Sequence, residues 1–133
     1  HGEATSARFA DLAEYYLSDK EYEPGTVLVF GGDAEVTTTG KYADYKVAGI
    51  VSTNPGFTMN TELKGTRVCI ALQGRVPCKI IGPVQKGDLI TTSPVPGYAA
   101  VTSSPQTGTI IGKSVEDNFT NGQCVVEISI GKM

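Results

Sequence analysis

The residues in this chain whose types and spacing could do chemistry are two carboxylates near its N-terminus, Asp11 and Glu14. In a helix, residues three apart are neighbours on one face, so the two side chains would lie side by side. Two carboxylates held close together can separate their pKa values and serve as a general acid and a general base. The simpler interpretation is a solvated helix face, and the sequence leaves both interpretations open.

Other kinds of catalytic site find little support in the sequence. The only histidine is His1, so a Ser-His-Asp or Cys-His system has no internal histidine to carry the proton. The chain has three cysteines, an odd number, and no C-x-x-C pair: Cys69, Cys78 and Cys124. This favours small buried side chains over a disulfide framework or a zinc site. Gly112-Lys113-Ser114 lacks the upstream glycine of a phosphate loop. We therefore expect no metal and no cofactor.

The bulk properties of the chain bound its size class and its partners. Its 133 residues fit one domain, or two very small lobes that share a core. The net charge is −3 and no basic stripe occurs, which argues against nucleic acid as a partner. No apolar run approaches the roughly 20 residues of a membrane-spanning helix, so we expect no membrane insertion. Because the chain starts at His1 rather than Met, we expect it to be a processed product or an excised part of a longer protein.

Residues 1–20 differ from the rest of the chain and form a predicted lead-in, or stalk junction. The segment Thr5–Leu17 contains neither Gly nor Pro. Four apolar side chains recur in it at helical spacing: Phe9, Leu12, Ala13 and Tyr16. This pattern predicts a short amphipathic helix. An extended lead-in from an upstream stalk is the alternative, because short helices depend on tertiary partners.

Residues 21–133 have the pattern of an all-β domain. Short runs rich in β-branched residues follow one another at intervals of about ten residues, separated by turns that contain Gly or Pro. The clearest run is Cys124–Ile130, in which buried and solvent-facing positions alternate as in a half-buried strand. The sequence therefore predicts a small barrel or sandwich.

The β domain also repeats itself, which predicts two similar halves, residues 21–82 and 83–133. Four segments recur in the same order: Pro24–Phe30 as Lys86–Thr92, Ala34–Thr37 as Ala99–Thr102, Val47–Gly49 as Ile110–Gly112, and Gly65–Gly74 as Gly122–Gly131. The alternative is chance, because such short β patterns are common. The last match has two registers. Aligning the glycines pairs Ala71 with Ile128, whereas a shift of one residue pairs Ile70 with Ile128 and places the opposite face in the core.

Three strings carry a resemblance to a known family: ATSARFADLAEYY at Ala4–Tyr16, YEPGTVLVFGG at Tyr22–Gly32 and VAGIVSTNP at Val47–Pro55. Together they resemble the C-terminal domain of tail-fibre and other virion structural proteins of tailed bacteriophages. Some of that group are similar to the autoprocessing intramolecular chaperone domain at the end of phage appendage proteins. The resemblance extends through the second half mainly at Lys86–Leu89.

The resemblance implies a homotrimer at the tip of a fibre, made in the host cytoplasm and carried on the virion. Its role would be to promote trimerisation and folding of the upstream fibre stalk and, in some members, to cleave itself off. Asp11 and Glu14 are the positions that match the family motif. No cleavage junction is recognisable in the chain, and autoproteolysis is the one enzymatic activity that the resemblance implies. The trimer contacts would come from the apolar stripe of the lead-in, Phe9, Leu12, Ala13 and Tyr16.

Aromatic residues in predicted loops favour a second function, the binding of a host-surface glycan or protein. These residues are Tyr42, Tyr45, Phe57 and Tyr98. Aromatic rings stack on sugars and anchor protein interfaces. The alternative is that they fill the core of a chain that has no tryptophan. A self-cleaving chaperone domain is the third hypothesis.

Overall fold

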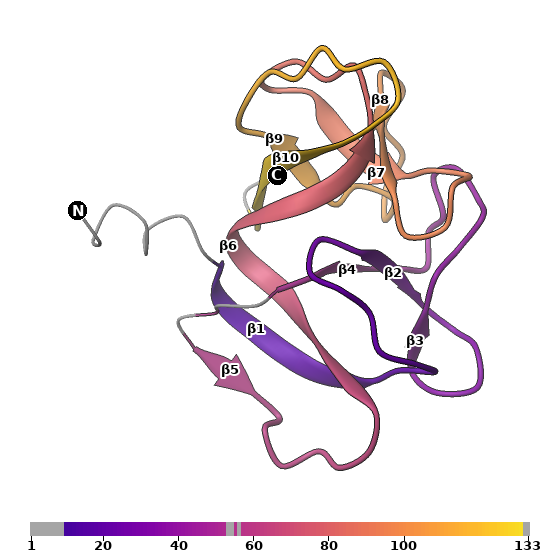
Figure 1. Cartoon of the computed structure of the whole chain (residues 1–133), viewed down its shortest axis with the longest axis vertical. Helices are drawn as coiled ribbons and strands as arrows, with labels where there is room; N and C mark the ends of the chain where they lie inside the picture. The colour runs from indigo at the N-terminus through magenta and orange to yellow at the C-terminus, as the bar shows by residue number, and fades with distance from the viewer. Residues whose placement is uncertain (1–9, 53–54, 56, 132–133) are drawn as a thin grey trace.

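The structure is a computed structural model that describes residues 10–52, 55 and 57–131. The described residues contain ten strands and no helix (Figure 1). The strands are β1 (Ala10–Leu17), β2 (Val27–Phe30), β3 (Val36–Thr37), β4 (Val47–Val51), β5 (Thr58–Met59), β6 (Arg67–Ile81), β7 (Leu89–Thr92), β8 (Ala99–Thr102), β9 (Gly112–Ser114) and β10 (Gln123–Ile130). The prediction of an all-β barrel or sandwich is confirmed.

The helix predicted over Thr5–Leu17 is wrong within the described residues, because Ala10–Leu17 form strand β1. β1 pairs antiparallel with β6, so that Glu14 lies opposite Ile70 and Tyr16 lies opposite Val68. A helix of this length would be marginal by itself, whereas a strand gains a ladder of backbone hydrogen bonds from its neighbour. The extended alternative is therefore the correct one.

Strand β6 is 15 residues long and belongs to both ends of the molecule. Its first part, residues 67–74, pairs with β1 and β4, and its second part, residues 74–81, pairs with β10 and β8. Figure 1 shows β6 rising from the side of β1 and β5 at the bottom of the view to the group β7–β10 at the top. The two ends of the molecule are thus built on one continuous strand.

The strands form two lobes, and each lobe closes on itself. In the C-terminal barrel, β6, β8, β7, β9 and β10 form a ring, because β10 pairs with both β9 and β6. In the N-terminal lobe, β6, β4, β2 and β3 are neighbours in that order, and β1 lies on the other edge of β6. A bridge between Ser18 and Val36 and a hydrogen bond from Glu35 N–H to Leu17 O join β3 to the end of β1 and complete this second ring.

The two lobes repeat one strand order, as a duplication of one β unit would require. The pairings among β2, β3, β4 and the first part of β6 recur among β7, β8, β9 and β10, and β1 takes the place of the second part of β6. Individual hydrogen bonds recur as well. Gly25 N–H donates to Val51 O at 2.9 Å, and Gly87 N–H donates to Ser114 O at 2.8 Å. The boundary between the two repeats therefore falls inside β6.

Two glycines decide between the registers of the last repeat match. A Cβ at Gly49 would meet Ile70 Cγ2, and a Cβ at Gly112 would meet Ile128 Cγ2. Ile70 therefore corresponds to Ile128, and the alignment that pairs Ala71 with Ile128 is wrong. The repeats preserve the strand face that lines each lobe, while the glycines at the turns have shifted by one residue.

A second predicted match is displaced by two residues. Phe30 pairs with Val36, and its counterpart Thr92 pairs with Ala99. Val36 thus corresponds to Ala99, whereas the sequence match had paired Val36 with Val101. Because the displacement is an even number of residues, the face that points into the lobe is the same in both alignments.

Each lobe has its own hydrophobic core, and the larger core continues between the lobes. The core of the N-terminal lobe consists of Leu28, Val36, Val51, Val68 and Ile70. The core of the C-terminal barrel includes Cys78, Ile80, Ile90, Val126 and Ile128, and it reaches Val27, Ile50 and Ala71 of the N-terminal lobe. Successive residues of β2, β4 and β6 therefore serve different cores, as the alternation of a strand requires.

We expect Gly112→Ala to destabilise the protein by about 1–3 kcal/mol, because the new Cβ would overlap the backbone carbonyl oxygen of Ser129, which cannot swing away. Urea unfolding followed by circular dichroism measures the change. The matched control is Gly40→Ala, whose Cβ would lie an ordinary 3.5 Å from Pro94 O and should be nearly neutral. Equal stability of the two variants would contradict the close packing of β9 on β10.

Candidate functional site

Glu14 lies beside an aromatic side chain rather than on a shared helical face with Asp11. Because residues 10–17 form a strand, the predicted one-turn spacing of the two carboxylates is wrong. The side chain of Asp11 lies outside the described part of the structure. The Tyr16 hydroxyl donates a hydrogen bond to Glu14 Oε1 at 3.2 Å. Glu35, which no sequence pattern singles out, also belongs to this group: its Oε1 accepts a hydrogen bond from Leu17 N–H at 2.8 Å.

The electrostatics of this group keep the Tyr16 phenol protonated. Burial raises the pKa of Tyr16, and the negative charge of Glu14, its hydrogen bond to Glu14 and the charge of Glu35 raise it further. The Tyr16 ring also meets Phe30 edge to face, with centroids 5.4 Å apart. A phenol in this setting donates a hydrogen bond but is a poor source of protons at neutral pH.

The predicted trimer stripe is not a single exposed surface in the chain. Ala13 is fully buried and Leu12 is half-buried. Tyr16 packs against the core of the N-terminal lobe. Phe9 lies outside the described residues. Two register shifts, on either side of Leu12, interrupt the alternation of β1. As trimer contacts these residues stay a prediction.

Three of the four predicted receptor-binding aromatics are exposed. Tyr42 and Tyr45 lie on the β3–β4 loop, and Phe57 lies before β5; the exposed fraction is 68% for Tyr45 and 64% for Phe57. Tyr98 is half-buried, and the Lys79 ammonium lies 5.8 Å from its ring centroid. Only Tyr42 and Tyr45 share a loop. Phe119 is also exposed, and the sequence pattern held no signal for it beyond its place in a predicted turn.

Asp44 holds the Tyr42–Tyr45 loop against the C-terminal barrel. Its N–H donates to Thr92 Oγ1 at 2.7 Å, and its carboxylate accepts from Lys46 N–H at 2.9 Å and from the Thr39 hydroxyl at 2.7 Å. Burial opposes ionisation of Asp44, but these hydrogen bonds and the charge of Lys46 outweigh it and lower the pKa of the carboxyl. The loop that carries the two tyrosines is therefore anchored at its middle.

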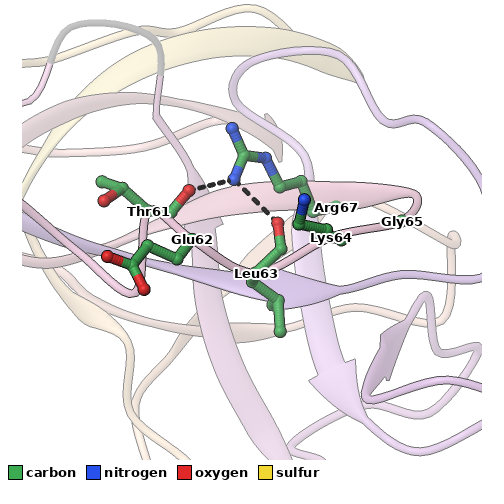
Figure 2. A pocket seen from close by; sticks show the side chains of 6 residues that line it. All are labelled: Thr61, Glu62, Leu63, Lys64, Gly65 and Arg67. Carbon is green, nitrogen blue, oxygen red and sulfur yellow. Dashed lines mark hydrogen bonds between the residues drawn. The ribbon is translucent and has the colours of Figure 1, made fainter.

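A hollow of about 700 Å³ lies in the loop between β5 and β6 (Figure 2). It is lined by Thr61, Glu62, Leu63, Lys64, Gly65 and Arg67. Arg67 Nη1 donates to Thr61 O at 2.6 Å and to Leu63 O at 2.9 Å. The guanidinium carbon of Arg67 lies 4.0 Å from the centroid of the Tyr15 ring on β1. The sequence held no signal for this site, because its key contact joins residues from distant parts of the chain.

The described residues include no cluster of three or more His, Cys, Asp or Glu side chains that could hold a metal ion. In the same part of the chain, no helix is long and apolar enough to cross a membrane. Cys69 and Cys78 are buried and Cys124 is half-buried, and all three are free thiols. Burial raises the pKa of the Cys78 thiol, and the neighbouring Cys124 adds to the increase.

No family model and no curated protein sequence matches this chain. Among solved structures, the chain is similar to the C-terminal fragment of gene product 12 of bacteriophage phi29. The TM-score is 0.64, the sequence identity is 15%, and the match covers 91% of this chain and 100% of that chain. The similarity shows the fold, and because it spans nearly the whole chain it includes both lobes.

The raised pKa of Tyr16 predicts a loss of stability in alkali. A tyrosine whose folded pKa exceeds its unfolded value stabilises the fold fully below the unfolded pKa, and this contribution is lost as the pH rises through the folded pKa. The free energy of unfolding should therefore fall as the pH rises above the ordinary value of 10.0, and it should fall less in Tyr16→Phe.

Urea unfolding at a series of pH values measures this difference. Glu14→Gln should lower the pKa of Tyr16 in an ultraviolet titration because it removes a neighbouring negative charge, whereas the control Glu62→Gln should leave it unchanged. An identical alkaline decline in the wild type and in Tyr16→Phe would contradict the account of this site.

Proposed function

We propose that this chain is a C-terminal tip domain of a tail fibre or another virion structural protein of a tailed phage. In this proposal it is made in the host cytoplasm, becomes part of the virion, and promotes trimerisation and folding of the upstream fibre. The observation that carries the proposal is the whole-chain similarity to the C-terminal fragment of a bacteriophage gene product, which includes both lobes and the strand that joins them.

The physical argument for an assembly role is one of entropy. Three long chains that must come together in register lose much freedom before their contacts form, and joining the ends first reduces that loss. A compact module with its own cores can fold early and associate before the stalk does.

We place the contact between subunits on the side of β1 and β5. Among the described residues β5 pairs only with β1, which leaves its other edge without a partner strand there. Phe57 precedes β5 and Met59 is its last residue, and both side chains are exposed. Exposed aromatic and Met side chains are enriched in protein interfaces. An open strand edge is itself a site at which a second chain can pair.

We expect the chain to have about three times its monomer mass of 14.0 kDa in light scattering. Phe57→Ser should shift the population toward monomer, because it removes an exposed apolar anchor. Phe119→Ser removes an equally exposed phenylalanine from the C-terminal barrel and should leave the mass unchanged. A monomer at every concentration would reject an assembly role for this chain.

Binding of a host-surface glycan or protein is a second candidate, favoured by the exposure of Tyr42 and Tyr45 on one anchored loop. The chain should then adsorb to cells of a susceptible host, and the double change Tyr42→Ala and Tyr45→Ala should remove most of the adsorption. Phe119→Ala serves as the control. Adsorption that is absent, or that survives the loss of both tyrosines, would reject this candidate.

A further inference from the structure

The guanidinium of Arg67 is held in place by its contacts, but only one of its three nitrogens donates hydrogen bonds to the described residues. Both of its hydrogen bonds come from Nη1, one to Thr61 O and one to Leu63 O, and Tyr15 covers one face of the guanidinium. A guanidinium carries five N–H donors, so three remain, on Nε and Nη2. These three have no hydrogen-bond partner within the described residues. Figure 2 shows the second terminal nitrogen turned away from the two carbonyl oxygens.

Immobilisation makes the remaining donors of Arg67 effective for binding. A free arginine side chain loses about 2 kcal/mol of rotamer entropy when a ligand fixes it. In this chain the two carbonyls and the Tyr15 ring fix the guanidinium beforehand. An exposed pair of donors on Nε and Nη2 matches the two oxygens of a carboxylate or phosphate, and such charge-assisted bonds are among the strongest in proteins.

The surroundings of Arg67 indicate a ligand larger than a simple ion. The hollow of about 700 Å³ is shallow and open to solvent, and it has room for a sugar-sized group beside the guanidinium. Lys64 adds a second positive charge to its lining. Thr61 and Glu62 supply a hydroxyl and a carboxylate, which are groups that pair with sugar hydroxyls.

We propose that the hollow around Arg67 binds an acidic sugar, with Arg67 and Lys64 on its phosphate or carboxylate group and with Thr61 and Glu62 on its hydroxyls. The site is separate from the Tyr42–Tyr45 loop and from the β5 edge. Its test measures direct binding to the chain, so it stands or falls independently of trimerisation and of adsorption to cells.

The first experiment is a heteronuclear NMR titration of the full chain with glucose phosphate, glucuronate and glucose. We expect either or both acidic sugars to move the Arg67 Nε–H resonance and the backbone amides of residues 61–67, and we expect glucose to move neither. A response to glucose phosphate alone identifies a phosphate site, and a response to glucuronate alone identifies a carboxylate site. An Arg67 resonance that no acidic sugar moves, or that glucose moves equally, would overturn the proposal.

The second experiment separates binding by Arg67 from its structural contacts with the loop. Arg67→Lys keeps the charge but loses the paired donors, and it should weaken binding by about tenfold. Lys64→Gln should weaken it less and leave the loop contacts intact. Lys113→Gln removes an exposed charge from β9 and should have no effect. If Lys113→Gln weakens binding as much as Lys64→Gln, the binding is nonspecific charge attraction and the proposal is wrong.

Discussion

The structure depends on strand β6 serving two lobes at once. Its first part completes the N-terminal lobe with β1 and β4, and its second part completes the C-terminal barrel with β8 and β10. Neither lobe can close without it, because in each ring it joins strands that are otherwise far apart in the order of the sheet. The larger core also contains side chains from both lobes. A repeat unit of this size would be marginal alone, and the shared strand makes two such units one folding body.

The duplication also shows where the lobes differ. β1 in the N-terminal lobe occupies the place that the second part of β6 occupies in the C-terminal barrel. The positions of these two segments that point into the lobes differ in polarity. In β1 they are polar, namely Glu14, Tyr16 and Ser18, and the corresponding positions in β6 are apolar, namely Val76, Cys78 and Ile80. The Tyr16–Glu14 pair and the hollow around Arg67 therefore both lie in the N-terminal lobe.

Local patterns predicted most of the fold, and the failures have physical causes. The alternation of Cys124–Ile130 and the repeated turn glycines at Gly25 and Gly87 predicted the strands and the duplication. The segment Ala10–Leu17 fits both a helical and an extended period, and only its pairing with β6 decides between them. The Arg67 site was not predictable, because it depends on the Tyr15 ring from a distant strand and on two backbone carbonyls.

Native-state hydrogen exchange along β6 tests most directly whether its two parts form one cooperative unit. The account predicts that paired amides in residues 67–73 and in residues 75–81 exchange with the same opening free energy, equal to the free energy of global unfolding. Exchange of residues 67–73 through an opening much less costly than that of residues 75–81 would contradict it. That result would mean that the N-terminal lobe unfolds while the C-terminal barrel stays closed, and that β6 does not couple them.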